Sequence, residues 1–188
     1  GSRGLSRFVA ALGDKFSAAA AASLDYAMDG VASCVGALLE HSADACINAR
    51  PMQPFELTDA KEVGVSLQEH VVGWAHAAII VHPINPVQEL SLSQLAEIYQ
   101  GKVKNWSELG GEDWPIELFG PPRDSLPADV VHASVLSLNG AAAEFPAELT
   151  EIRESKELLA TVARTPGAIA FAQTQDVAAE TAKGVHRG

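Results

Sequence analysis

The stretch NPVQELSLSQLAEIYQGKVKNWSELGG, from Asn85 to Gly111, carries the clearest structural signal in the chain. Ser91, followed three residues later by Gln94, is typical of a capping box, in which two side chains satisfy the free amides of a helix start. Gly101 is placed to end the same helix. Between these limits the apolar residues recur at helical spacing, as Leu92, Leu95, Ile98 and Tyr99. The stretch therefore predicts a helix that begins just after Ser91.

The residues around this helix predict an alternation of strands and helices. Residues 71–82 are apolar and rich in β-branched side chains, and Pro83 and Pro86 follow, so this segment is expected to be extended. Helices are expected at 4–21, 31–39, 54–63, 129–138, 155–164 (capped by Ser155) and 176–183, and strands at 24–28, 43–48, 116–119 and 168–172. This alternation indicates an α/β fold with parallel strands.

The composition excludes several classes of partner. Lys and Arg number 13 against 24 Asp and Glu, which gives a formal net charge of −11. Nucleic acids and anionic membrane surfaces attract clustered basic residues, so neither is expected as a partner. The apolar stretch at 71–81 is about half as long as the roughly 20 residues that a membrane span requires, so insertion of this segment into a membrane is not expected. No signal peptide is visible, and Gly1-Ser2 opens the chain abruptly, as in an excised piece.

The two cysteines and six histidines predict no metal site and no cofactor. His70, His76 and His82 lie six residues apart, which suits neither one face of a helix nor the usual ligand spacings. Cys34 opens an expected helix and Cys46 lies in the strand that follows, so the two are expected close together. Two alternatives remain open: a disulfide suited to an oxidising compartment, or two buried free thiols.

The motifs between Asn85 and Gly111 resemble the phosphate-transporter type of periplasmic solute-binding protein. Asn-Pro-Val, the capped helix, Ile-Tyr-Gln-Gly and Asn-Trp-Ser-Glu-Leu-Gly-Gly occur in that family's order, and Trp106 is expected to serve packing. Further pieces in family order are Gly1-Ser2, Asp29–Met52, LFGPPRDS (Leu118–Ser125) and PGAIAF (Pro166–Phe171). The resemblance covers nearly the whole chain.

The resemblance implies a two-lobe periplasmic-binding-protein-like fold (type II), in which each lobe is a short, mostly parallel sheet flanked by helices. Residues 1–73 plus 169–188 are expected to form the first lobe and 74–168 the second, together one solute-binding domain with its ligand in the cleft. The strand that the family normally has before Gly1 is not in the sequence.

The resemblance also implies a ligand site at three loops. The helix starts after Ser2, Gly30 and Ser125 are expected to point backbone N–H groups at an oxyanion. Arg3, Arg50 and Arg123 each fall in a loop that the family places at the cleft. Two alternatives remain open: the three arginines make a positive pocket, or they are solvated or paired with Asp29, Asp44 or Asp124. The candidate ligand residues are Ser2, Arg3, Gly30, Ser33, Arg50, Arg123 and Ser125.

The second-lobe loop departs most from the family pattern. The expected Asp-Ser-Gly-Thr reads Asp124-Ser125-Leu126-Pro127. Leu126 adds a side chain where glycine allows close backbone approach, and Pro127 removes both an amide donor and a hydroxyl. Val31 likewise replaces the family's serine, with Ser33 nearby. These losses predict that tight phosphate binding is absent.

These observations favour a non-catalytic module that is a divergent anion-binding, sensor or interaction domain. The first alternative is a functional substrate-binding component of a phosphate or other oxyanion ABC transporter, and the second is a phosphatase-like enzyme on the same fold. Ser125 lacks a Gly-x-Ser-x-Gly context, so an enzyme is not expected. Expected partners are a small anion (phosphate, sulfate or carboxylate), a protein partner or flanking domains of a larger chain, in the periplasm or outside the cell.

Overall fold

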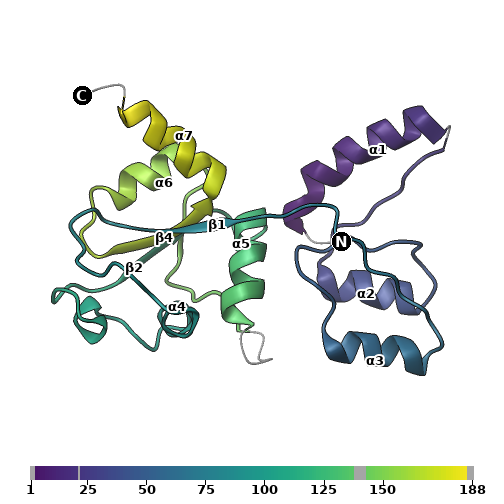
Figure 1. The fold of residues 1–188 in the computed structure, drawn as a ribbon, viewed down its shortest axis with the longest axis horizontal. Helices are drawn as coiled ribbons and strands as arrows, with labels where there is room; N and C mark the ends of the chain where they lie inside the picture. Colours follow the sequence, from purple (N-terminus) through teal and green to yellow (C-terminus); the bar gives the residue numbers. More distant parts are fainter. Residues whose placement is uncertain (1–2, 21, 138–142, 186–188) are drawn as a thin grey trace. The chain divides into compact units, whose positions relative to one another are not determined.

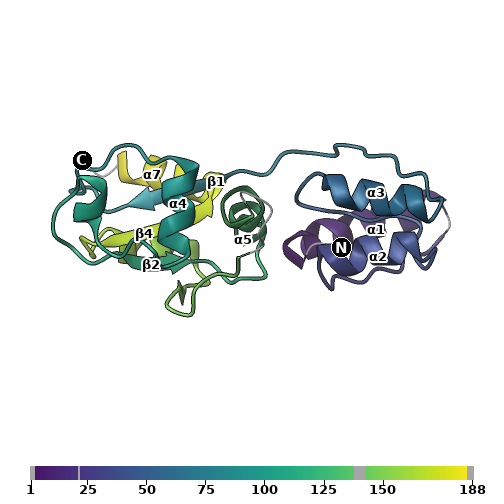
Figure 2. The same ribbon diagram turned by 90° about the horizontal axis from the view of Figure 1, so that it is seen from below.

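The computed structural model describes residues 3–20, 22–137 and 143–185. The chain forms two compact units, Gly1–Trp74 (unit 1) and Ala75–Gly188 (unit 2). Both units are drawn in Figures 1 and 2.

Unit 1 is helical in its described residues. A short 3₁₀ helix, η1 (Arg3–Leu5), leads into α1 (Ser6–Ala20), and α2 (Val31–Leu39) and α3 (Pro54–Glu62) follow. The helices expected at 4–21, 31–39 and 54–63 are therefore confirmed. In both views α2 and α3 lie side by side (Figures 1 and 2).

The strands expected at 24–28 and 43–48 are wrong, because no strand occurs in the described part of unit 1. Extended backbone becomes a strand only when a neighbouring segment completes its hydrogen-bond ladder. Leu24 and Tyr26 also stay 41% and 51% exposed, so this segment does not bury the side chains that a core strand would. The sheet expected for the first lobe is thus missing from these residues.

A disulfide joins Cys34 near the start of α2 to Cys46 in the segment after it, with a Cα–Cα distance of 5.5 Å. Of the two alternatives from the sequence, the disulfide is therefore the one found. It closes a short loop within unit 1, and unit 2 contains no cysteine.

Reduction of this disulfide is expected to lower the free energy of unfolding of unit 1 by about 3 kcal/mol, the value for a loop of this length. Urea unfolding followed with and without dithiothreitol measures the change. The transition of unit 2 provides an internal control and should not move. An unchanged transition of unit 1 would show that the cross-link contributes nothing to its stability.

Unit 2 is built on a four-stranded mixed sheet in the order β1-β4-β2-β3. β1 (Ala77–Val81) runs antiparallel to β4 (Ala168–Gln173), whereas β2 (Glu117–Gly120) is parallel to both β4 and β3 (Thr150–Glu151). The expected strands at 116–119 and 168–172 are found within a residue or two, whereas only 77–81 of the segment expected to be extended at 71–82 forms a strand. The fold class, an α/β sheet flanked by helices, is confirmed in this unit.

Helices cover both faces of the sheet (Figure 1). One face carries α4 (Leu92–Tyr99) and α5 (Leu126–Val131), which continues into a π-helical turn, η3 (His132–Leu136). The other face carries α6 (Ser155–Val162) and α7 (Thr174–Val185). Two apolar clusters fill these layers, one around Tyr99, Trp106 and Phe171 and the other around Leu158 and Val162.

The helix starts follow the sequence signals in most places. Ser91 and Gln94 form the expected capping box at α4, and Gly101 has a φ of 69°, which favours glycine. The helix expected at 129–138 begins earlier, at Leu126. The expected cap at Ser155 is wrong: Glu154 is the N-cap of α6, and the Ser155 hydroxyl donates to the Asp176 carboxylate instead.

Trp106 fixes the loop after α4 to the sheet. It begins a 3₁₀ helix, η2 (Trp106–Leu109), and is 0% exposed. Its Nε1 donates to the Gly167 carbonyl at 2.9 Å, just before β4. The packing role expected for Trp106 is therefore found.

The division into units differs from the expected lobes at the C-terminal end. The resemblance predicts 169–188 in the first lobe, whereas β4 and α7 lie in unit 2. The physical reason is that β4 is an inner strand of this sheet, bonded to β1 along one edge and to β2 along the other.

Candidate ligand-binding loops

The seven candidate ligand residues are divided between the two units. Ser2 lies outside the described residues, and Arg3 begins η1. Gly30, Ser33 and Arg50 belong to unit 1, whereas Arg123 and Ser125 belong to unit 2.

Gly30 is the N-cap of α2 and has φ 113° and ψ 173°, a backbone conformation that side chains rarely adopt. Its carbonyl accepts the Cys34 N–H at 3.2 Å, so the helix begins directly after it. Ser33, in the first turn, is exposed. Among the described residues no side chain caps this start, which leaves first-turn amides available to water or an anion.

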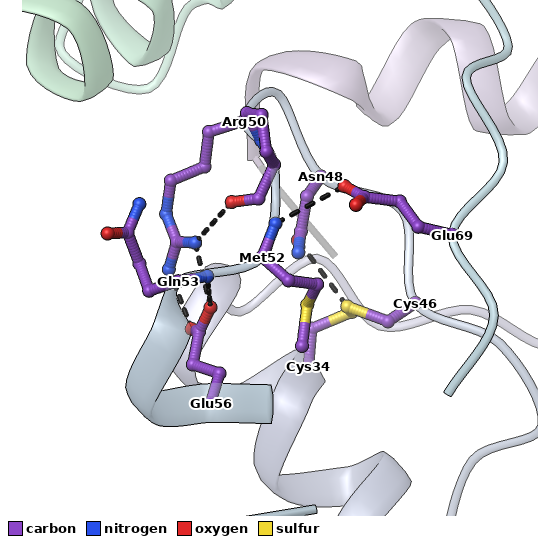
Figure 3. Close-up of polar contacts among 9 residues, drawn as sticks. Cys34, Cys46, Asn48, Arg50, Met52, Gln53, Glu56 and Glu69 are labelled. Carbon is purple, nitrogen blue, oxygen red and sulfur yellow. Dashed lines mark hydrogen bonds and ion pairs between the residues drawn. A yellow bond between two sulfur atoms is a disulfide. The ribbon is translucent and has the colours of Figure 1, made fainter. Parts of the chain in front are cut away.

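Arg50 forms a two-pronged ion pair with Glu56 inside unit 1 (Figure 3). Its Nη2 donates to Glu56 Oε1 at 2.7 Å, and its Nη1 donates to Glu56 Oε2 at 2.9 Å and to the Pro51 carbonyl at 2.8 Å. The pair is well shielded, with side-chain exposures of 19% for Arg50 and 5% for Glu56. Three of the five guanidinium N–H groups are thus used within the chain.

Glu56 has a second structural role at the start of α3. Its Oε2 also accepts the Gln53 N–H at 2.7 Å, which satisfies a free amide of that helix start. The hydrogen bond from Arg50 holds the pKa of Glu56 below its ordinary value against the opposing effect of burial. Glu56 is therefore a carboxylate that stays charged inside unit 1.

The loop that holds this pair also borders the disulfide (Figure 3). Cys46 Sγ lies 3.4 Å from Asn48 Oδ1, and the Met52 N–H donates to Glu69 Oε1 at 3.2 Å. The segment from Cys46 to Gln53 is therefore held by a covalent bond and several polar contacts.

Arg123 is also occupied by acceptors from its own unit. Its Nε donates to Glu151 Oε1 at 2.9 Å, and its two terminal nitrogens donate to the carbonyls of Phe145 and Pro146, each at 2.8 Å. This pair is exposed, with side-chain exposures of 38% and 41%. Arg123 therefore ties the loop before α5 to the segment around β3.

Ser125 precedes α5 and offers few donors. Its N–H donates to the Pro122 carbonyl at 2.9 Å, and its hydroxyl oxygen is buried without a hydrogen-bond partner among the described residues. Pro127 has no N–H, and Ala128 is 0% exposed, so its amide is closed to solvent. In this first turn, the N–H of Leu126 is therefore the donor that remains for a ligand.

The arginine partners were not predicted. The alternative in which the arginines are paired names Asp29, Asp44 and Asp124 as acceptors, whereas the structure uses Glu56 and Glu151. Gln53 and Glu56 have the spacing of a capping box, and this spacing is the sequence signal that could have predicted a structural role for Glu56. Glu151 lies far from Arg123 in the sequence and carries no such signal.

No other feature of the described residues adds to the site. They contain no cluster of three His, Cys, Asp or Glu side chains suited to a metal ion, and no helix long and apolar enough to cross a membrane. A groove of unit 2, about 510 Å³, is lined by residues such as Ile98, Lys104 and Thr150 and includes none of the candidate ligand residues.

Curated relatives match part of the chain. The phosphate-binding protein PstS of Bacillus subtilis (strain 168) is 36% identical over 106 residues, 56% of this chain and 34% of the relative. Protein SphX of Synechococcus elongatus (strain ATCC 33912 / PCC 7942 / FACHB-805) is 24% identical over 129 residues, 65% of this chain and 37% of the relative. The chain thus spans about a third of the length of these curated relatives.

Solved structures share the fold across most of the chain. An ABC-type phosphate transport receptor from Vibrio cholerae superposes with a TM-score of 0.74 at 20% identity, covering 93% of this chain and 70% of that one. PstS from Borrelia burgdorferi gives 0.72 at 17% identity, with coverages of 98% and 72%. A family model described as a PBP superfamily domain matches residues 1–188. With its sheet flanked by helices, its ordered motifs and this match over its whole length, the chain belongs to the PBP superfamily of periplasmic-binding-protein-like domains.

Proposed function

We propose that this chain is a non-catalytic, phosphate-binding-protein-like module that does not bind phosphate tightly and serves as a sensor or interaction domain. The observation that carries the proposal is the start of α5. Ser125 uses its N–H internally, Pro127 has none, and Ala128 is buried. One first-turn amide, that of Leu126, is left to meet an anion.

The arginines support the same proposal. A guanidinium attracts an anion most strongly when its charge is not already compensated. Arg50 is paired with Glu56 and Arg123 with Glu151, and each makes three hydrogen bonds to its own unit. The positive pocket expected from the sequence is therefore largely neutralised.

A weaker anion site is compatible with these contacts. Within unit 1, the donors we assign to it are the amides at the start of α2, after Gly30, with Ser33, and the remaining N–H groups of Arg50; Arg123 is a separate candidate donor within unit 2. A carboxylate, sulfate or phosphate would bind there with an affinity that falls as salt is added, because the start of α2 is exposed at Ser33.

The relatives support the cellular setting that we propose. PstS from Bacillus subtilis is named as a phosphate-binding protein, and the Vibrio cholerae structure is a phosphate transport receptor of the ABC type. On the basis of this similarity we propose that the chain works in the periplasm or outside the cell. A protein partner or neighbouring domains of a larger chain would respond to whether its site is occupied. Catalysis forms no part of the proposal.

Repair of the α5 start is expected to create phosphate affinity. Leu126→Gly with Pro127→Thr restores a close backbone approach, an amide donor and a hydroxyl. Two regained hydrogen bonds to a charged ligand, each of about 1.5 kcal/mol, correspond to about a 100-fold gain in affinity. Isothermal titration calorimetry with phosphate on both proteins measures the gain.

Leu126→Gly with Pro127→Ala is the matched control for the hydroxyl, since it returns the amide alone. Its affinity should fall between those of the chain and the repaired variant. Micromolar binding by the unmodified chain would contradict the proposal and favour a functional transporter component. Equal, weak binding by all three proteins would contradict the role assigned to this loop.

A further inference from the structure

The disulfide of unit 1 joins two segments that carry candidate ligand residues. Cys34 follows Ser33 near the start of α2, and Cys46 lies four residues before Arg50 (Figure 3). The Cα atoms of the two cysteines are 5.5 Å apart. The start of α2 and the Arg50 segment, residues 46–53, are therefore held together by a covalent bond that a thiol can break.

The hydrogen bonds of the Arg50 segment lead to other parts of unit 1. Arg50 pairs with Glu56 of α3, and the Gln53 N–H donates to the same carboxylate. The Met52 N–H donates to Glu69. Residues 46–53 form no helix or strand of their own. Loss of the disulfide would thus free one end of this segment from α2 and leave its other end attached to α3.

The position of Cys34 favours reduction of the disulfide. Because helical side chains point toward the helix start, its sulfur lies over the first turn of α2. No acidic residue occurs in that turn, and no described side chain caps it. Free amides and the helix dipole stabilise a cysteine thiolate there, and a stabilised thiolate is the better leaving group. Cys46 is half-buried whereas Cys34 is 8% exposed, so the Cys46 sulfur is the one we expect a reductant to attack.

We propose that this disulfide is a redox switch for the anion-binding segments of unit 1, an inference that rests on the weak anion site of the proposed function. Two thiol groups of a reductant supply two electrons and two protons. The first thiolate attacks the Cys46 sulfur, and Cys34 leaves as a thiolate that takes up a proton. The second thiolate attacks the mixed disulfide at the reductant's sulfur, so the reductant becomes a disulfide and Cys46 becomes a thiol.

The two redox states differ in how the donors are held. In the oxidised state the amides after Gly30, with Ser33, stay beside the Arg50 segment, so one anion can meet both. In the reduced state the segment moves independently of α2, and the donors no longer share a ligand. Reduction is expected to weaken anion binding about tenfold, the effect of one lost hydrogen bond to a charged ligand, while the helices of unit 1 stay folded.

Thiol counting in glutathione tests the reactivity of the disulfide. Alkylation followed by mass spectrometry of the whole chain is expected to show reduction without denaturant. Ser33→Asp places a negative charge beside the leaving Cys34 thiolate and should slow reduction several-fold. Ser33→Asn is the matched neutral control. A disulfide that glutathione reduces only in urea, or equal rates for the two variants, overturns the proposal.

Hydrogen exchange measures whether reduction releases the segment. The Cys34 N–H, bonded to the Gly30 carbonyl, and the Met52 N–H lie on the two sides of the disulfide. Both are expected to exchange several-fold faster after reduction, whereas the Val63 N–H at the end of α3 stays protected. Unchanged exchange on both sides overturns the proposal. Equal loss of protection at Val63 also overturns it, because the disulfide is then a structural cross-link.

Sulfate titration at low salt separates failure of this inference from failure of the proposed function. The oxidised chain is expected to bind about tenfold more tightly than the variant with Cys34→Ser and Cys46→Ser, which cannot respond to reductant. The parent chain kept in reductant gives the same comparison where the double variant does not fold. Equal affinities overturn the switch alone. Sulfate binding by neither protein contradicts the anion site of the proposed function and overturns this inference with it.

Discussion

Gly167→Ala is expected to lower the free energy of unfolding of unit 2 by about 4 kcal/mol or more, at the extreme end of single substitutions. A Cβ at this position would overlap the Pro115 carbonyl oxygen and lie 3.3 Å from its carbon. Both are backbone atoms, so no side chain can turn aside to relieve the overlap.

Two hydrogen bonds prevent Gly167 from moving away. Its carbonyl accepts the Trp106 Nε1–H at 2.9 Å and the Glu117 N–H at 3.0 Å. A shift of the backbone would break the start of the β2–β4 ladder and leave the buried indole unpaired.

Urea unfolding followed by tryptophan fluorescence measures the loss. Gly36→Ala, within α2, is the control, because an added methyl there meets no atom within 4 Å and alanine favours a helix. It should be neutral or stabilising. A Gly167→Ala protein as stable as the parent would contradict the contact between Gly167 and Pro115.

Glu56→Ala is expected to lower the free energy of unfolding of unit 1 by about 3 kcal/mol, the lower end of the range for breaking a buried ion pair. The substitution leaves the shielded Arg50 guanidinium without its carboxylate and removes the acceptor of the Gln53 N–H. Glu151→Ala is the matched control. It breaks an exposed pair with Arg123 and should change stability by less than about 1 kcal/mol.

The same pair predicts a dependence of stability on pH. Because the pKa of Glu56 is lowered in the folded protein from its ordinary 4.5, its contribution is fully present above that value. This stabilising contribution of Glu56 is lost as the pH falls below 4.5 and through the lowered pKa. Thermal unfolding of the parent and of Glu56→Gln across this range measures the difference, which should narrow with acidification. A constant difference would contradict the role given to the charge.

Local signals predicted most of the helices and the strands of unit 2. The Ser91–Gln94 capping box depends on residues one turn apart, and it formed as expected. β4 and β1 are apolar stretches that a sheet core buries. The family motifs predicted the packing of Trp106, which residue patterns alone do not specify.

Features that depend on distant residues were predicted poorly. The segment at 24–28 has strand-like residues, but a strand also needs a partner, which periodicity does not reveal. Whether Cys34 and Cys46 would bond was open for the same reason. Arg123 finds its carboxylate 28 residues along the chain, so its pairing followed from the fold and not from the loop sequence.

Phosphate calorimetry on the unmodified chain tests the central claim most directly. We predict no binding heat at micromolar phosphate, and at most a weak, salt-sensitive response to millimolar phosphate, sulfate or citrate. The α5 start, with a single accessible amide, and two arginines already paired with Glu56 and Glu151 are the reasons. A saturable phosphate isotherm with a Kd in the micromolar range or below would contradict the account.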